Sequence, residues 1–228
     1  MSVILHIETS TNVCSCALSE ENRIIANRED FKGQSHAALL GVFADEMMGE
    51  ARRLQLPVDA VAVSSGPGSY TGLRIGVSEA KGLAYGLDVP LIAISTPLIM
   101  ASTMQDRANK NTLLCPMIDA RRMEVYATFF DLSLNVIKPT SADIIDETSY
   151  REWLDAHEIL FFGNGAEKCK QAIRHPNARF IDGVHPLASA MAPLAESFFN
   201  EKKFVDTAYF EPFYLKEFVA TVAKNKVF

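Results

Sequence analysis

The side chains best suited to chemistry lie in two short polar turns, one in each half of the sequence. The first turn follows an apolar run and comprises Glu8, Thr9, Ser10 and Thr11. Hydroxyls and backbone N–H groups cradle an anion, and a carboxylate beside them orients a hydrated Mg²⁺ ion. A hairpin turn capped by Thr and Ser has the same composition without any ligand. These residues alone leave both interpretations open.

The second polar turn also follows an apolar run, and it comprises Asp119, Ala120, Arg121 and Arg122. Two guanidinium groups beside a carboxylate can clamp a phosphate group or an acidic group of a partner. Charged residues on a solvated turn give the same pattern. One sequence does not decide between these two interpretations.

A glycine-rich turn joins a short apolar strand to a helix over residues 66–76, with the sequence GPGSYTGLRIG. Free N–H groups at a helix N-terminus favour phosphate. However, no Lys-Ser or Lys-Thr pair follows the glycines as in a P-loop, and the spacing differs from the dinucleotide-binding fingerprint. We therefore favour a packing role, in which Gly68 and Gly72 supply backbone freedom and Gly76 and Ala80 allow a close approach.

Small residues recur once per turn along this helix, at Gly72, Gly76, Ala80 and Ala84. Residues four apart lie on one face of a helix, so they form a stripe with few side-chain atoms. Such a stripe lets another backbone come unusually close. We predict that it meets a partner helix, from the same chain or from another.

Composition and spacing exclude several functions. With a net charge of −6, the chain lacks the clustered Lys and Arg that grip a phosphate backbone. No two of the five histidines have the spacing of metal ligands, and no serine lies in a nucleophile elbow, so we predict no metal, no cofactor and no hydrolase chemistry. The four cysteines fall in or beside apolar runs and are expected to be reduced core residues. No apolar run is long enough for a signal peptide or a membrane span, which predicts a cytoplasmic protein without membrane contact.

Hydrophobic periodicity predicts one order of elements twice. In the first half we expect strands at 3–7, 14–18, 24–28, 58–63 and 91–94, and helices at 37–54, after the glycine turn, and at 97–104. After a polar linker at 105–111 we expect strands at 113–118, 124–130, 134–138, 159–162 and 179–181, and helices at 149–156, 166–174 and 186–200. We therefore predict two domains, a partner-binding half at 1–104 and a second half at 105–228, whose C-terminal tail packs back on the first.

Each half has the order βββαβαβα, which implies a mixed sheet covered by helices on both faces. Two such halves that face each other across a cleft define the α/β actin-like, or ribonuclease-H-like, superfold. In this superfold the turns that contain Glu8 and Asp119 lie opposite each other. Gly163 and Gly165 lie where the superfold approaches adenosine, although a plain strand-to-helix connection with Asn164 near the cap explains them as well.

Several segments together resemble one family. They are IETS at 7–10, the glycine block at 66–77, AKGLA at 80–84, DARR at 119–122 with EVY at 124–126, and YL at 214–215. These segments resemble the TsaB family, whose members are bacterial subunits needed to make threonylcarbamoyladenosine in tRNA. The resemblance covers nearly the whole chain and is strongest through residue 130.

The resemblance implies an actin-like fold and a division of labour. In the family, a catalytic paralogue of the same fold binds metal and transfers threonylcarbamoyl to adenosine 37 of tRNA. The TsaB-like subunit binds and activates this paralogue. The paralogue carries paired metal-binding histidines, whereas this sequence offers only His36 in that region, so the resemblance implies a non-catalytic subunit. It also implies that a small P-loop ATPase docks on the pair, that tRNA is reached only through the complex, and that a second copy of the chain is an alternative partner.

In the family, the subunits pair through the helix after the glycine turn and its neighbour. The partner interface expected here comprises Gly72, Arg74, Ile75, Gly76, Ala80, Lys81 and Ala84. The expected remnants of a phosphate or nucleotide site are Glu8, Thr9, Ser10, Asp119, Arg121, Gly163 and Gly165. The alternative function is an autonomous ATP-dependent phosphotransferase of the actin-like superfold, which would use the Glu8 turn and the cleft.

Overall fold

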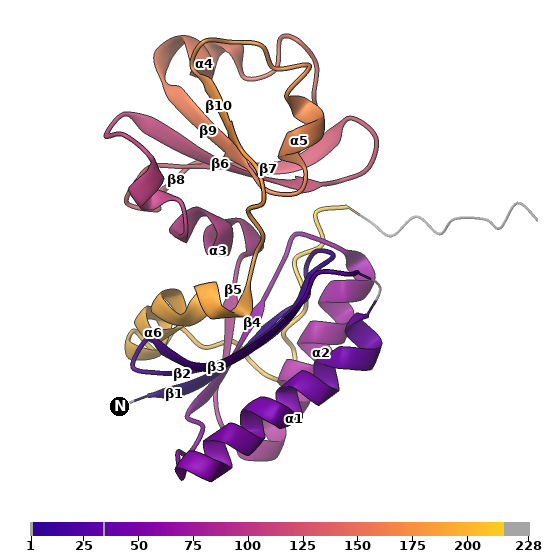
Figure 1. The fold of residues 1–228 in the computed structure, drawn as a ribbon, viewed down its shortest axis with the longest axis vertical. Helices are drawn as coiled ribbons and strands as arrows, with labels where there is room; N and C mark the ends of the chain where they lie inside the picture. The colour runs from indigo at the N-terminus through magenta and orange to yellow at the C-terminus, as the bar shows by residue number, and fades with distance from the viewer. Residues whose placement is uncertain (1, 34, 217–228) are drawn as a thin grey trace, which may run out of the picture.

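Two five-stranded sheets, one in each lobe, form the framework of the molecule (Figure 1). The computed structural model describes residues 2–33 and 35–216. The first sheet has the strand order β3-β2-β1-β4-β5 and the second has the order β10-β9-β6-β7-β8. Both orders are the same when each half is numbered from its own first strand. This repeat confirms the duplicated α/β fold predicted from the sequence.

The first sheet is built around its first strand. Its strands are β1 (Val3–Glu8), β2 (Cys14–Glu20), β3 (Arg23–Asp30), β4 (Ala60–Ser64) and β5 (Leu91–Ile94). The central strand, β1, pairs antiparallel with β2 and parallel with β4. All six residues of β1 are buried, because helices cover both faces of the sheet.

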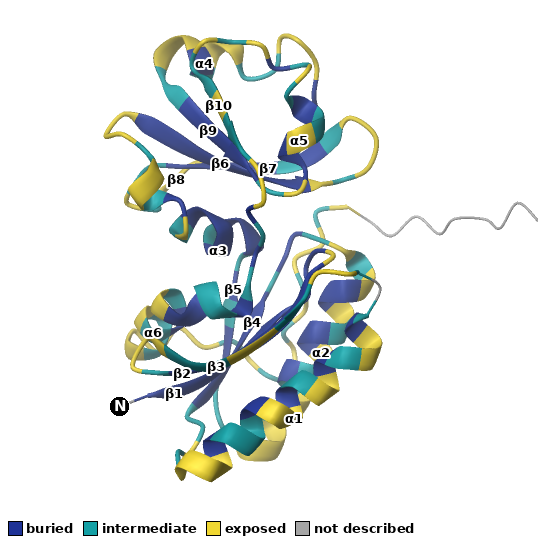
Figure 2. Cartoon of the chain, in the orientation of Figure 1, coloured by how far each residue is buried: buried dark blue, intermediate teal, exposed yellow. Residues whose placement is uncertain are grey.

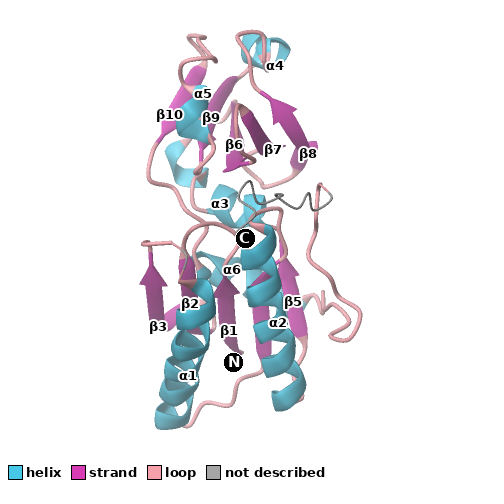
Figure 3. Cartoon of the chain, turned by 90° about the vertical axis from the view of Figure 1, so that its right-hand side faces the viewer, coloured by secondary structure: helices cyan, strands magenta, loops and turns pink. Residues whose placement is uncertain are grey.

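Two long helices, α1 (His36–Leu54) and α2 (Tyr70–Leu87), lie side by side on one face of the first sheet (Figure 3). Leu40, Ala44 and Met47 of α1 recur at helical spacing and are buried against the sheet. The helix α2 begins where Ser69 caps it, since the Ser69 hydroxyl accepts a hydrogen bond of 3.2 Å from the backbone N–H of Gly72. The outward faces of both helices are exposed (Figure 2).

The second sheet repeats this arrangement with shorter helices. Its strands are β6 (Thr112–Asp119), β7 (Glu124–Phe130), β8 (Val136–Ile144), β9 (Glu158–Phe162) and β10 (Ala178–Ile181). The helices α4 (Arg151–Ala156) and α5 (Ala166–Cys169) belong to this half. Between the lobes, α3 (Thr96–Ser102) is followed by the short 3₁₀ helix η1 (Gln105–Arg107). Met100 and Ala101 of α3 pack against the inner face of the second sheet, so this helix connects the two cores.

The last helix corrects one prediction. We expected a helix at 186–200 to complete the second half, but the 3₁₀ helix η2 (Ala188–Met191) and α6 (Ala192–Asn200) pack against the first sheet. Met191 and Ala195 share a core cluster with Ile4 and Ile92. The inner face of the second sheet is already covered by α3, whereas the small alanines of β4 leave room on the first sheet.

Two further elements have different bounds from those predicted. The strand predicted at 134–138 is β8, which extends to Ile144 because it pairs with β7 beyond a register shift. It lies at a sheet edge and is partly exposed, so its apolar alternation is weak. The helix predicted at 166–174 ends at Cys169 and continues as a turn. No helix in the described part of the chain is long and apolar enough to cross a membrane.

Candidate functional site

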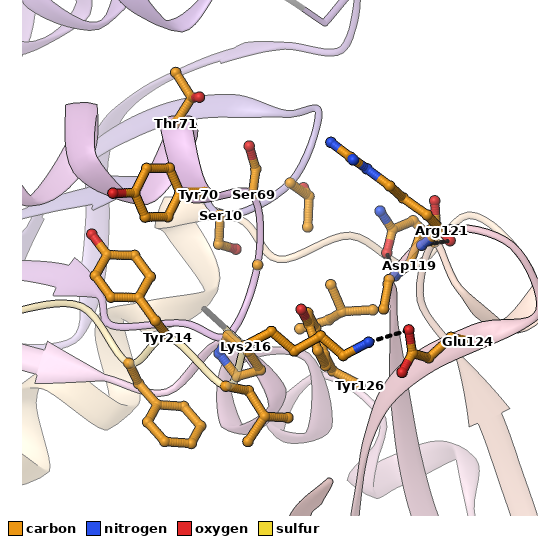
Figure 4. A pocket seen from close by; sticks show the side chains of 18 of the residues that line it. Ser10, Ser69, Tyr70, Thr71, Asp119, Arg121, Glu124, Tyr126, Tyr214 and Lys216 are labelled. Carbon is orange, nitrogen blue, oxygen red and sulfur yellow. Dashed lines mark hydrogen bonds and ion pairs between the residues drawn. The ribbon is translucent and has the colours of Figure 1, made fainter. Parts of the chain in front are cut away.

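A cleft of about 640 Å³ opens between the two halves (Figure 4). Three groups of residues line it: the β1–β2 turn with the glycine turn, the β6–β7 turn, and a segment near the C-terminus. They include Ser10, Ser69, Tyr70, Asp119, Arg121, Arg122, Glu124, Tyr126, Tyr214 and Lys216. The structure therefore brings together the two polar turns that the sequence placed opposite each other.

Glu8 is buried below the cleft and does not line it. Its side chain is 0% exposed, and the same is true of Thr9, so the expectation that both face the cleft is wrong. One carboxyl oxygen accepts a hydrogen bond from the backbone N–H of Ser10. Burial raises the pKa of Glu8 from 4.5 to about 7, although hydrogen bonds from Ser10 and its neighbours oppose this rise. Of the predicted turn, Ser10 and Thr11 reach the cleft.

The glycine turn packs directly on the β1–β2 turn, at the residues that follow Glu8. The backbone N–H of Ser69 donates a 2.7 Å hydrogen bond to the carbonyl of Ser10. A methyl group on Gly68 would lie only 2.2 Å from that same carbonyl oxygen. The Thr9 hydroxyl in turn donates to the carbonyl of Gly72 at 2.8 Å. This close approach supports the packing role that we favoured for the glycines.

The small-residue stripe of α2 lies inside its own subunit. A methyl group on Gly72 would lie 2.1 Å from the Thr9 carbonyl oxygen, and one on Gly76 would lie 2.1 Å from the Thr9 hydroxyl. Ala80 and Ala84 are at most 1% exposed and belong to the core of the first half. The prediction that these four residues meet a partner is therefore wrong. The backbone that comes close is the chain's own β1–β2 turn, which helical periodicity alone does not reveal.

The three larger residues predicted for the partner interface have different positions. Arg74 is exposed, and its guanidinium lies 5.4 Å from the centre of the Tyr70 ring. Ile75 is half-buried against the core of the first half. Lys81 is half-buried, and its ammonium donates to the carbonyls of Ala208 and Phe210, both at 3.0 Å. Arg74 is therefore the member of the predicted set that faces solvent.

Apolar residues on the outer faces of α1 and α2 form a surface that the sequence analysis missed. We call this surface the α1–α2 face, and its exposed large apolar residues are Val42 of α1 and Tyr85 of α2, whereas Leu54 and Leu87 are the last residues of their helices and continue the buried stripes. Tyr85 is 85% exposed and Val42 is 52% exposed. The missed signal is that Val42 and Tyr85 are apolar residues off the buried stripes of their helices.

On the opposite wall of the cleft, the β6–β7 turn presents two arginines. Arg121 and Arg122 are exposed and have φ angles of 69° and 45°, a region that side chains larger than glycine seldom adopt. Among the ion pairs of the described residues, neither guanidinium contacts a carboxylate. Asp119 is instead paired with Lys168. The turn thus offers unpaired positive charge to the cleft.

Gly163 and Gly165 serve the packing of the second half. A methyl group on Gly163 would lie 2.4 Å from the carbonyl oxygen of Met117, and one on Gly165 would lie 2.9 Å from the backbone carbon of Ile118. Of this connection, Asn164 lines the cleft, and its side-chain oxygen accepts a 3.0 Å hydrogen bond from the backbone N–H of Asp119. The end of β6 therefore occupies the space directly against both glycines.

Two histidines, His6 and His36, and all four cysteines are buried in the fold. His36 is buried, with its Nε2 atom 3.2 Å from the carbonyl oxygen of Val13. Burial lowers the pKa of His6 to about 3, so this residue is neutral. All four cysteines are buried and free, as predicted for core residues. Across the described residues, no three His, Cys, Asp or Glu side chains gather as metal ligands do.

A pair of sheets with identical strand order, connected through α3 and separated by a cleft, defines an α/β protein of the actin-like class. The chain matches the sequence profile of TsaD, described as tRNA N6-adenosine threonylcarbamoyltransferase, over residues 26–224. It is 32% identical to the tRNA threonylcarbamoyladenosine biosynthesis protein TsaB of Escherichia coli, over 95% of this chain and 96% of that protein. The TsaB protein of Bacillus subtilis is 29% identical, over 75% of this chain and 74% of that protein.

Solved structures agree with these relatives. YeaZ from Pseudomonas aeruginosa superposes with a TM-score of 0.79 at 26% identity, over 94% of this chain and all of that one. A second structure from that organism, described as an uncharacterized protein with similarity to peptidase YEAZ, has a TM-score of 0.81 at 25% identity, over 95% of this chain and 100% of the other. The chain belongs to the TsaB family, and its role lies in tRNA threonylcarbamoyladenosine biosynthesis.

Proposed function

We propose that this chain is a non-catalytic subunit that binds and activates the catalytic paralogue in the N6-threonylcarbamoylation of tRNA adenosine 37. The observation that carries the proposal is the contrast between the two sides of α2. Its inner side packs against Thr9 of the β1–β2 turn, whereas its outer side presents the exposed Tyr85, with Val42 exposed on the neighbouring α1. A protein that acts by association needs such an outer side and does not need an accessible carboxylate.

The buried carboxyl argues against the alternative of an autonomous phosphotransferase. A phosphotransferase of this superfold would use Glu8 to orient a metal-bound water in the cleft. Glu8 is 0% exposed and is not among the residues that line the cleft. Burial also favours the neutral acid, which is a poor ligand for a divalent cation.

The α1–α2 face has the chemistry of a protein interface. Exposed aromatic and aliphatic side chains supply the buried centre of an interface, and Tyr and Arg are common among the residues that dominate binding. Tyr85 and Val42 offer this centre, and Arg74 lies on the same helix as Tyr85. In this proposal, the four small residues of α2 do not contact the paralogue. They pack α2 against the first half and so hold in place the helix that carries the interface.

The proposed assembly has further members. The catalytic paralogue is the direct partner, a small P-loop ATPase docks on the pair, and a second copy of this chain takes the paralogue's place when the chain is alone. The complex works in the cytoplasm and reaches tRNA through its other subunits, since this chain has a net charge of −6. Arg121 and Arg122 at the cleft, which form no ion pair with the residues that the structure describes, remain the candidates for contact with a phosphate or an acidic group.

A matched pair of substitutions tests the interface. Val42 of α1 is 52% exposed and Val136 of β8 is 55% exposed, so an aspartate at either position meets similar solvent in the free chain. Val42→Asp would bury an unpaired charge against the paralogue and should weaken binding at least tenfold in calorimetric titration. Val136→Asp should bind as the wild type does. Equal affinity of Val42→Asp and the wild type for the paralogue would refute this interface.

Reconstitution tests the activity itself. The paralogue, the ATPase, threonylcarbamoyl-adenylate and tRNA are combined with and without this chain, and modified adenosine is measured. We expect modification to depend on the chain. Modification of tRNA by the isolated chain, or turnover of Mg-ATP by it, would instead support an autonomous enzyme.

A further inference from the structure

A segment near the C-terminus, residues 203–216, runs back along the first half and ends at the cleft (Figure 1). We call this segment the strap. The backbone N–H of Val205 donates a 2.9 Å hydrogen bond to the Leu91 carbonyl, and these residues form an antiparallel bridge at the edge strand β5. The backbone N–H of Phe213 donates a 2.7 Å hydrogen bond to the Ser65 carbonyl, just after β4. The strap is therefore anchored along the first half by its backbone.

The helix α2 holds the strap through two side chains. The Lys81 ammonium donates to two carbonyls of a single turn of the strap, those of Ala208 and Phe210. At the beginning of α2, the Tyr70 ring lies 4.9 Å from the Tyr214 ring, at an angle of 40°. A displacement of α2 therefore moves the strap at two places, through Lys81 near Phe210 and through Tyr70 at Tyr214.

The last described residue of the strap contacts the other half. The Lys216 ammonium forms an ion pair with the Glu124 carboxylate, at the first residue of β7 (Figure 4). Phe213, Tyr214 and Leu215 line the same cleft. The strap thus connects α2 in the first half to β7 in the second, across the mouth of the cleft.

We propose that the strap is a latch that couples the opening of the cleft to the position of α2. The ion pair is partly exposed, with 45% of the Lys216 side chain and 20% of the Glu124 side chain accessible. Exposed ion pairs are weak and break readily, which suits a reversible latch better than a structural tie. When the pair is intact the strap holds the halves closed, and when α2 shifts the strap loosens. The inference concerns this chain by itself and stands or fails independently of the proposed partner.

Distance measurements between the halves test the latch in the full chain. Because all four native cysteines are buried and free, spin labels can be directed to Arg23→Cys in the first half and Val136→Cys in the second. Both native side chains are exposed, and Val136 pairs with Phe130 at the end of β8 away from Glu124, so the labels do not touch the latch. Double electron–electron resonance then gives the distribution of distances between the halves.

Two variants release the latch, one at each end, and a third variant serves as a control. Lys216→Met removes the ion pair, and Lys81→Met removes one of the two holds of α2 on the strap, leaving the Tyr70–Tyr214 contact, while touching neither the cleft nor the second half. Arg179→Met removes an ion pair with Glu158 that lies wholly within the second half, with similarly exposed side chains. The exchanged pair Lys216→Glu with Glu124→Lys re-forms the contact with reversed charges.

Lys216→Met should raise the population of open molecules about two- to fivefold, the range that loss of one exposed ion pair produces, and Lys81→Met should raise it in the same direction. The exchanged pair should restore the wild-type distribution, and Arg179→Met should leave it unchanged. A wild-type distribution for Lys216→Met would overturn the latch. A wild-type distribution for Lys81→Met would overturn its coupling to α2.

Discussion

The contact between α2 and the β1–β2 turn predicts opposite effects of alanine at two glycines of the same helix. Gly76 faces the Thr9 hydroxyl, where a methyl group would lie 2.1 Å from the oxygen, whereas Gly82 has nothing within 4 Å. Both positions are interior to α2, so alanine gains the same helix propensity at each, about 0.5–1 kcal/mol. The difference between the two variants therefore isolates the packing term.

The structure sets the size of that difference. Overpacking a buried site costs about 1–3 kcal/mol, since Thr9 is fully buried and the added methyl overlaps its side chain. If the Thr9 side chain turns away, its hydrogen bond to the Gly72 carbonyl is lost, at about 0.5–1.5 kcal/mol. We therefore expect Gly82→Ala to stabilise the chain slightly and Gly76→Ala to be less stable than Gly82→Ala by about 2–4 kcal/mol.

Urea unfolding followed by circular dichroism, with hydrogen exchange of the α2 amides, measures this difference. The amide signal is needed because the single tryptophan, Trp153, belongs to α4 of the second half and does not report on α2. In the double variant Thr9→Ala with Gly76→Ala, the hydroxyl is gone and the remaining Cβ lies 3.3 Å away, so part of the loss should be recovered. Equal stability of the two glycine variants, or no recovery in the double variant, would refute the packing argument.

Two other predictions concern buried ionisable groups. Because burial raises the pKa of Glu8 from 4.5 to about 7, the folded chain binds a proton more tightly than the unfolded chain; the stability due to Glu8 is complete below pH 4.5 and falls as pH rises to about 7. Wild type should therefore lose up to about 3 kcal/mol over this range relative to Glu8→Gln, and parallel urea-midpoint profiles for the two proteins would contradict the assignment. Burial also raises the thiol pKa of all four cysteines, to about 11 for Cys14 and Cys169. The native chain should resist a disulfide reagent at pH 8 and take up four equivalents only after denaturation, so rapid native labelling would be evidence against these buried positions.

The order and type of the elements could be predicted because each has a local cause. The strand β1 is a continuous apolar run, α1 repeats its buried residues at helical spacing, and the duplicated order follows from these patterns. The destination of α6 could not be predicted, because its apolar face fits either half equally well. Its place is decided by the empty face of the first sheet, which depends on where α3 packs.

The sequence predicted which turns meet at the cleft, but it did not predict which side of α2 faces the rest of the chain. Ser10, Asp119 and Arg121 meet at one cleft because they end strands that the fold brings together. The stripe of α2 was assigned to the wrong neighbour, since a lack of side chains shows that a backbone comes close without showing which one. Tyr214 and Lys216 were missed as cleft residues, because their place depends on backbone bonds made far away in the sequence.

The glycine block accounts for two properties of this chain that otherwise look unrelated. Without side chains at Gly68, Gly72 and Gly76, the glycine turn and the first turns of α2 come close to Thr9 and Ser10, next to the fully buried Glu8. A carboxyl group in that dry site prefers its neutral form and cannot serve an ion in the cleft. The same contact fixes α2 against the sheet, and a helix held on its inner side presents its outer residues in one arrangement. The burial of the Glu8 turn and the docking surface that we propose on α2 therefore both involve the close contact that these three glycines allow.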